Sequence, residues 1–292
     1  MRITARQAGF TLMEIIVVIV ITSIVAAMVA TFIRLPFLSY VDVAARAELT
    51  DVADTALRRM GRDLRLALPN SVRITKVSDN KYYLEMLLTK TGGRYLVEEE
   101  TVNGRFLQFE RPTLDCVATP LDPGCAFDVV GNMPAAPLNI VVGDKIVVYN
   151  LGLAPADAYS GGNLTTVTSV VGNRINFAPQ VFATQVPAMR SPSHRFQVVS
   201  TPVTYFCDGS FSGGSGKLLR YSGYAISANQ PMPPVGGKSA LLADGIVKCS
   251  LNYEQVANVH SALVGMTISM ARPNKDTGTV QLFNQVHVDN TP

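Results

Sequence analysis

The chain has 292 residues, of which 48% are hydrophobic, and its formal net charge is +3. Arg2 and Arg6 supply two of those charges, so the rest of the chain is close to neutral. No basic stripe runs along it, which argues against a nucleic-acid-binding protein. The length allows one sizeable globular domain or two small ones beside an N-terminal apolar segment.

An uncharged apolar run extends from Ile15 to Ile33 and follows the hexapeptide GFTLME at residues 9–14. It is long enough for a helix to cross the ~30 Å hydrocarbon core of a membrane. Because Arg2 and Arg6 precede the run, the positive-inside rule places the N-terminus in the cytoplasm and the rest outside. We therefore expect a single-pass membrane protein with an exterior C-terminal domain.

The basic leader, residues 1–9, has the wrong order for a secretory signal, whose small-residue cleavage site follows the apolar stretch. Here the candidate processing point, Gly9, precedes that stretch. Cleavage between Gly9 and Phe10 would leave the apolar helix, residues 10–33, on the mature chain. It would also create a new α-amino group on Phe10.

Glu14 is the one carboxylate at the start of this helix. A carboxylate inside a membrane helix costs roughly 2.5–3.5 kcal/mol on insertion scales, and such residues usually have a partner. An amine on a neighbouring subunit would neutralise Glu14 during lateral assembly, which predicts an assembly role for it. The alternative is a plain signal anchor with Glu14 at the level of the lipid headgroups.

Residues 34–68 are predicted to continue the same helix as an amphipathic segment. Apolar residues recur at spacings of three or four, and charged residues occupy the opposite side. Pro69 ends the segment, because the residue before a proline avoids the α conformation. The apolar stripe must cover another part of the protein, and the downstream strands are the candidate. The recurring apolar residues are Leu38, Val41, Ala45, Leu49, Val52, Ala56, Met60 and Leu64.

Residues 69–292 change to a period of two and form the predicted exterior β-rich domain. A loop-rich stretch from Pro112 to Pro137 indicates an insertion that covers about 112–192. The predicted fold class is α+β, with one long N-terminal helix packed on an antiparallel β-sheet that carries an inserted β-rich lobe. The candidate strands are 72–77, 82–88, 95–99, 106–110, 145–149, 165–171, 196–199, 203–207, 218–221, 245–249, 264–270 and 280–288.

Four cysteines fit an oxidising exterior and allow three pairings. Cys116 and Cys125 flank a short Pro/Gly loop, whereas Cys207 and Cys249 each end an apolar strand-like run. Locality and strand context favour Cys116–Cys125 and Cys207–Cys249 as disulfides. A zinc site is the alternative, which the absence of a C-x₂-C pair disfavours.

No catalytic residue, metal site or cofactor site is predicted. The chain lacks a nucleophile elbow, and its three histidines lie far apart in the sequence. Asp115, Asp122 and Asp128 lie in the cysteine loop but lack the regular alternate spacing of a calcium loop. We therefore expect the protein not to be an enzyme.

The N-terminal pattern resembles the class III leader of type IV prepilins and pseudopilins. The matching residues are Gly9, Phe10, Thr11, Leu12 and Glu14. The resemblance implies that a prepilin peptidase cleaves between Gly9 and Phe10, that the new amine is methylated, and that the helix assembles with those of other pilins in the inner membrane. The sequence departs from common major pilins at Ser23 and Thr31, where they often carry Gly and Pro.

Short motifs elsewhere resemble the MSHA pilus biogenesis protein O family. This second resemblance implies a minor pilin-like subunit that initiates or caps an MSHA-type pilus, with its exterior domain in the periplasm or on the pilus at the cell surface. The motifs are ALRRM at 56–60, LPNSVR at 68–73, RFQVV at 195–199, PVTYFC at 202–207, LLRY at 218–221, LLAD at 241–244 and QVHVDNTP at 285–292.

Two other functions stay open at this point. A minor pseudopilin of a type II secretion system would share the leader and the helix. A membrane-anchored exterior enzyme or receptor domain belongs to a different class, and the missing catalytic constellation disfavours it.

Overall fold

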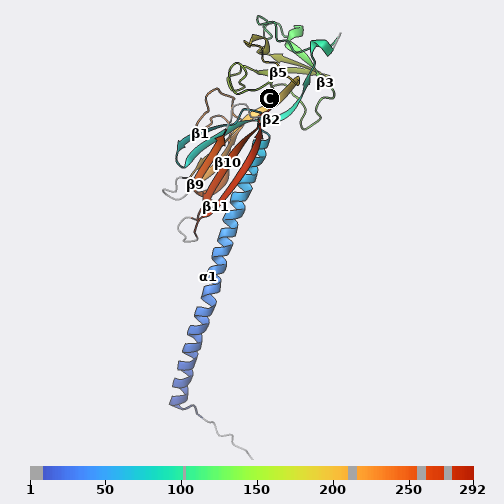
Figure 1. Ribbon diagram of the computed structural model, residues 1–292. Coiled ribbons are helices and arrows are strands. Elements are labelled where there is room, and N and C mark those ends of the chain that lie inside the picture. The colour runs from blue at the N-terminus through green and yellow to red at the C-terminus, as the bar shows by residue number, and fades with distance from the viewer. Residues whose placement is uncertain (1–8, 101–102, 210–215, 255–260, 273–277) are drawn as a thin grey trace, which may run out of the picture. The chain divides into compact units, whose positions relative to one another are not determined.

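The computed structural model describes residues 9–100, 103–209, 216–254, 261–272 and 278–292. The chain divides into two compact units, residues 1–49 and residues 50–292. The α+β fold class is confirmed, because one long N-terminal helix is followed by a large antiparallel sheet (Figure 1). The helix, α1, extends from Leu12 to Arg65.

In the first unit, the side chains of α1 from Leu12 to Arg34 are all exposed. In the second unit, one face of the helix is buried. The buried positions recur at spacings of three and four, which places them on a single face. They are Ala53, Ala56, Leu57, Met60 and Leu64.

The helix ends at Arg65, three residues before the predicted end at Leu68. The residues that follow pair with a strand instead of continuing the helix. The amide of Leu68 donates to the carbonyl of Leu87 at 2.7 Å, and the amide of Thr89 donates to the carbonyl of Leu66 at 2.8 Å. The sheet thus takes over the backbone groups that a further helical turn would have used.

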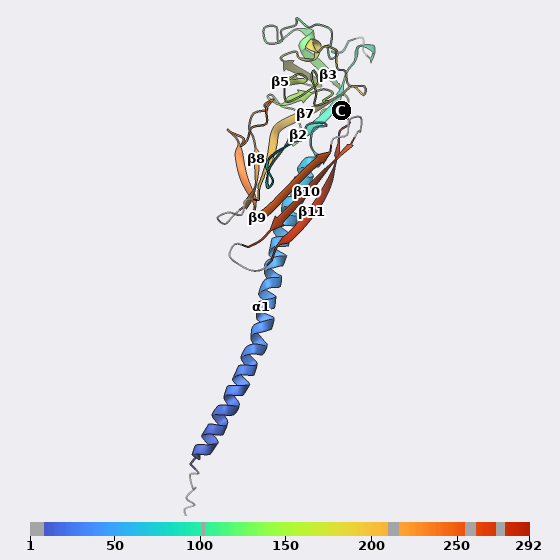
Figure 2. The same ribbon diagram turned by 60° about the vertical axis from the view of Figure 1, so that its left-hand side comes forward.

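In the described part of the chain, eleven strands form one sheet in which every pairing is antiparallel (Figures 1 and 2). Their order is β1-β2-β3-β6-β5-β4-β7-β8-β9-β10-β11, and β2 also pairs with β7. Short 3₁₀ turns cover Glu98–Glu100, Pro123–Cys125 and Phe182–Thr184. The strands are β1 Arg73–Ser78, β2 Lys81–Tyr95, β3 Ala126–Val130, β4 Lys145–Val147, β5 Leu164–Val171, β6 Arg174–Ala178, β7 Arg195–Asp208, β8 Gly216–Ser222, β9 Lys238–Glu254, β10 Ser261–Met270 and β11 Val280–Asp289.

The pair β2–β7 connects the two halves of the sheet. One end of the pair lies beside β1 and β8, and the other end lies beside β3 and β4. The segment between these two strands, residues 96–194, contains β3 to β6, and the insertion predicted at about 112–192 falls inside it. The inserted lobe is therefore an extension of the sheet along strands that it shares with the rest of the unit.

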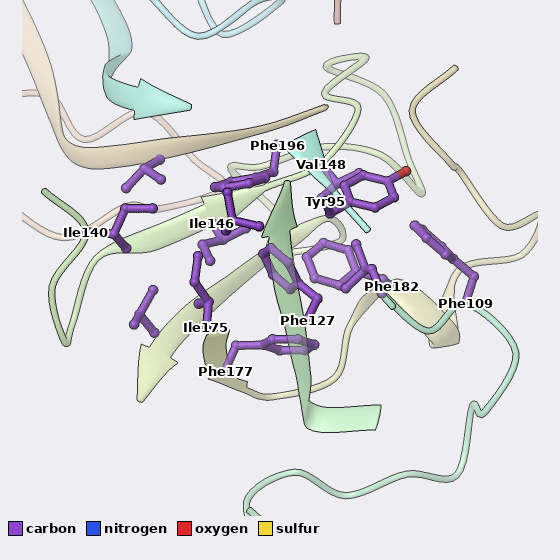
Figure 3. Close-up of a cluster of buried hydrophobic side chains, with 14 residues drawn as sticks. Tyr95, Phe109, Phe127, Ile140, Ile146, Val148, Ile175, Phe177, Phe182 and Phe196 are labelled. Atoms are coloured by element: carbon purple, nitrogen blue, oxygen red, sulfur yellow. The ribbon is translucent and has the colours of Figure 1, made fainter. Parts of the chain in front are cut away.

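An aromatic cluster fills this lobe (Figure 3). Phe127 is central, because its ring lies 5.2 Å from that of Phe196 and 6.0 Å from that of Phe177, measured between centroids. Contacts between aromatic rings at such distances add roughly 0.5–1.5 kcal/mol each beyond the area they bury. Tyr95 joins the cluster from the end of β2, and burial raises its pKa to about 12. The lobe thus has an apolar core of its own.

The sequence patterns did not predict β3 and β6, and two of the strands that they predicted are wrong. Residues 95–99 leave β2 and enter a 3₁₀ turn, and residues 106–110 form no strand. Leu107 and Phe109 nevertheless reach the aromatic cluster from an irregular segment. The alternation of apolar residues therefore shows only that one side of an extended chain is buried. An irregular segment that lies over a core has the same pattern as a strand.

Asp63 ties α1 to the sheet through two strands. Its Oδ2 accepts a hydrogen bond from the hydroxyl of Tyr205 on β7 at 2.7 Å and another from Nε of Arg220 on β8 at 2.8 Å. The Asp63 and Arg220 side chains are only 8% and 15% exposed. Burial, and then the neighbouring carboxylate, raise the pKa of Tyr205, so this hydroxyl stays a hydrogen-bond donor.

Two disulfides hold the second unit. Cys116 and Cys125 close a local loop in the inserted lobe. Cys207 on β7 is bonded to Cys249, in the half of β9 that pairs with β10. The second bond therefore reaches past β8, which pairs with β7 on one side and with the first half of β9 on the other.

We predict that Asp63→Asn destabilises the second unit by about 3 kcal/mol, because it leaves Arg220 without its counter-charge in a largely buried place. Thermal unfolding of the full chain in detergent, followed by circular dichroism, measures the loss. Asp54→Asn is the matched control on the same helix. Its exposed pair with Arg58 is expected to contribute below about 0.5 kcal/mol, so equal effects of the two changes would contradict the prediction.

We predict that Cys207→Ser/Cys249→Ser lowers the melting midpoint more than Cys116→Ser/Cys125→Ser does. The bonded cysteines are 42 and 9 residues apart, which on the chain-entropy model corresponds to about 4 and about 3 kcal/mol. The Cys116–Cys125 bond also constrains only one local loop. A larger drop for the Cys116/Cys125 variant in the same unfolding experiment would refute this ranking.

Candidate functional site: the N-terminal helix

The predicted processing and assembly residues lie at the start of α1. Gly9 and Phe10 are exposed and precede the helix, and Phe10 is 75% exposed. Glu14 lies in the first helical turn. Residues 1–8 of the predicted leader lie outside the described residues.

Thr11 caps the helix, a feature that the sequence reasoning missed. The Thr11 hydroxyl oxygen accepts a hydrogen bond from the amide of Glu14 at 3.3 Å, and the Thr11 carbonyl accepts one from the amide of Ile15 at 3.3 Å. The pattern Thr-x-x-Glu is a capping-box signature, so the signal was present in residues 11–14. Glu14 therefore also has a local part, as a negative charge near the positive end of the helix dipole.

The apolar surface of the first unit is suited to hydrocarbon. Over the described residues, α1 is the one helix long and apolar enough to cross a membrane. The hydroxyl side chains in this apolar part of the helix form hydrogen bonds with carbonyl groups of the same helix. The hydroxyls of Thr22 and Ser23 donate to the carbonyls of Val18 and Ile19 at 2.7 and 2.6 Å, and Thr31 bonds one turn back in the same way. Such bonds avoid the cost of an unpaired polar group in lipid.

The four cysteines and the acidic residues in and beside the cysteine loop lie in the second unit. Asp122 accepts two hydrogen bonds from Arg111, and Asp128 accepts two from Arg174. These arginines hold the pKa of both carboxyl groups below the usual range. Among the described residues, no group of three or more His, Cys, Asp or Glu side chains gathers as a metal ligand set would.

A family model for the prokaryotic N-terminal methylation motif matches residues 4–30. Comparison with curated proteins and with solved structures gave no match. The motif and the apolar helix with which it overlaps fit a type IV pilin-like subunit. The motif implies processing by a prepilin peptidase and assembly with other pilins, and together with the apolar helix it indicates membrane anchoring with a C-terminal domain.

We predict that Glu14→Ala and Glu14→Gln both leave membrane insertion intact while each lowers incorporation with partner pilins by about tenfold, or about 1.4 kcal/mol. The reason is that a neighbouring α-amine loses its counter-charge in either variant. Co-purification of partners from crosslinked membranes measures incorporation.

Glutamine tests the charge of Glu14 apart from its side-chain shape, because it keeps the Thr-x-x-Glu/Gln capping-box pattern and removes only the charge. Thr11→Ala is the complementary variant, since it removes the cap and keeps the carboxylate. Normal co-purification with Glu14→Gln would show that the charge has no part in assembly.

Proposed function

We propose that this chain is a minor pilin-like subunit that initiates or caps an MSHA-type type IV pilus. It is inserted in the inner membrane with its exterior unit in the periplasm, and it joins other pilins through its N-terminal helix. The observation that carries the proposal is the match to the methylation motif over residues 4–30, which includes the start of the exposed apolar helix.

The order of these parts supports a filament subunit over a cleaved export signal. Processing at Gly9 keeps the apolar helix on the mature chain and leaves Phe10 as its new end. The methylated amine of Phe10 then lies within one helical turn of the carboxylate on the same chain. A row of such helices brings the amine of one subunit near Glu14 of the next, so each buried charge gains a partner.

The inserted lobe supports a minor subunit over a major one. Residues 96–194 add four strands and an aromatic core between β2 and β7. In a filament built from one repeating subunit, every neighbour would have to accommodate that lobe. A subunit at an end of the filament meets fewer neighbours, so the added bulk is accommodated once.

The proposal assigns the chain no reaction of its own, and a prepilin peptidase performs the processing. Filament and secretion systems use the same leader, so the neighbouring genes and the identity of co-purified pilins distinguish an MSHA-type pilus from a type II secretion system. Recovery of secretion-system pseudopilins alone would replace the proposed function with the secretion alternative.

The processing prediction tests the proposal directly. Mass spectrometry of membrane-extracted protein is expected to find a mature chain that starts at Phe10 with one methyl group on its amine. Gly9→Leu is expected to block this cleavage nearly completely, because a side chain hinders entry to the peptidase. Among the described residues other than its chain neighbours, no atom lies within 4 Å of a Cβ built on Gly9, so we expect the substitution to leave the fold intact.

Ala5→Leu is the matched control, because it adds the same side chain to the leader away from the predicted cut. It is expected to be processed normally. An intact Met1 start in the unaltered protein, or cleavage after the apolar run, would refute the hypothesis that the chain is a pilin-like subunit.

A further inference from the structure

The two edges of the sheet differ in how they are protected. β1 is short, carries Arg73 and Lys76, and is partly covered where Arg73 donates hydrogen bonds to the carbonyls of Ser227 and Ala228. β11 is ten residues long, pairs along its whole length with β10, and contains no Lys, Arg or Pro. Within the described part of the chain, no backbone group pairs with its outer side. Natural proteins usually blunt such an edge with charge, proline or a cover, unless it binds a partner.

A groove of about 610 Å³ runs beside this open edge. One wall is β11, with Leu282, Phe283 and Asn284, and the other is the last turns of α1. Both views show β11 running beside these turns (Figures 1 and 2). Phe283 is 65% exposed, so the groove offers an apolar contact next to unpaired backbone.

The helix wall is basic. Arg58, Arg62 and Arg65 line the groove at spacings of four and three residues, which places them in one row. Arg58 is paired with Asp54, the one carboxylate of the lining, at 2.6 Å. Among the described residues, neither Arg62 nor Arg65 has an ion pair or a side-chain hydrogen bond. The groove therefore carries two positive charges that nothing in the chain's described part balances.

We propose that this groove binds an extended acidic segment of a partner protein, which adds a strand to β11 and places alternate carboxylates against Arg62 and Arg65. The open edge selects an extended backbone, because a helical segment has no free backbone groups with which to pair. The arginine row selects the charge of the segment. The proposal does not depend on the filament in which the protein acts.

The spacing of the two walls agrees with this occupant. Three residues of helix rise about 4.5 Å, so Arg62 and Arg65 lie about that far apart along α1, and their long side chains can spread by the further ~2 Å that alternate residues of a strand require. Alternate residues of a strand lie about 6.8 Å apart and point to the same side. A segment paired with β11 would thus present every second side chain to the arginine row, while its other side chains face away from the helix.

The test uses the full chain in detergent and fluorescent peptides of about ten residues, the length of β11. The first peptide alternates Asp and Val, and the second has the same composition with the aspartates in one block. Fluorescence anisotropy is expected to show at least about tenfold tighter binding of the alternating peptide. Arg62→Glu/Arg65→Glu is expected to abolish that preference and to weaken binding at least about tenfold.

Lys238→Glu/Lys248→Glu is the matched control, because it makes the same change in net charge on β9, away from the groove. It is expected to leave the affinity within about twofold. Circular dichroism melting confirms that both double variants are folded. Equal binding of the two peptides, equal effects of the two double variants, or no binding of the alternating peptide would each overturn the proposal.

Backbone methylation of the peptide tests the strand pairing itself. Two versions of the alternating peptide carry N-methyl groups on odd or on even residues. In a strand added to an edge, only one of these sets of amides points at β11. One version is therefore expected to lose binding at least about tenfold and the other to keep it within about threefold. Equal behaviour of the two versions would overturn strand addition. Sedimentation that shows self-association broken by Arg62→Glu/Arg65→Glu, without peptide binding, would assign the groove to a second copy of the chain and overturn the proposal.

Discussion

The second unit depends on the contact between Asp63 of α1 and the sheet. The carboxylate binds a tyrosine hydroxyl from β7 and a guanidinium from β8, and it does so on the same helix face that buries Met60 and Leu64. A stripe of small and aliphatic residues alone could slide along a sheet at modest cost, since hydrophobic contact is not directional. A charged group that needs two specific donors fixes the register, because any shift leaves a buried charge unpaired.

The sheet is held together by strands β2, β7 and β9, which pair with different strands along their length. β2 and β7 pair along their length and carry the inserted lobe at one end. β9 pairs with β8 through its first half and with β10 through its second half. The change of partner falls next to Gly245, whose φ of 72° and close approach to the carbonyl of Ala271 suit a residue without a side chain. The Cys207–Cys249 bond joins β7 to the second half of β9, so it bridges the place where β9 changes partner.

Sequence patterns predicted the helix and the fold class because both leave strong local signals. These are an uncharged apolar run followed by apolar residues at helical spacing. They failed where tertiary contacts decide. The helix ends at Arg65 because residues 66–68 find partners in β2, which no local propensity records. β3 was missed because Ala126–Val130 is short and lies among turn residues, and it is a strand through its pairing with β6.

The sequence pattern did not distinguish Asp63 from the other charged residues of the helix, because its partners lie 142 and 157 residues away. The Thr11 cap was within reach, because the capping pattern is local and complete in residues 11–14.

The cap also bears on how a carboxylate is tolerated at the start of a membrane helix. The dipole of a helix N-terminus stabilises a nearby negative charge by about 0.3–1 kcal/mol at exposed sites. Placing that charge inside the membrane costs roughly 2.5–3.5 kcal/mol at the helix centre. The position of Glu14 in the first turn therefore offsets at most about 1 kcal/mol, which is less than half of that cost. In a single chain, the remainder is lowered by keeping the first turn near the headgroups, where water reaches the carboxylate. Drawing the same turn deeper among other helices restores the cost unless a cation comes with it, and the amine at a processed Phe10 of a neighbour is a cation at the same end of the helix. The charge is thus tolerable at the membrane surface and needs a partner at depth, so under the proposed function the burial of Glu14 would accompany assembly.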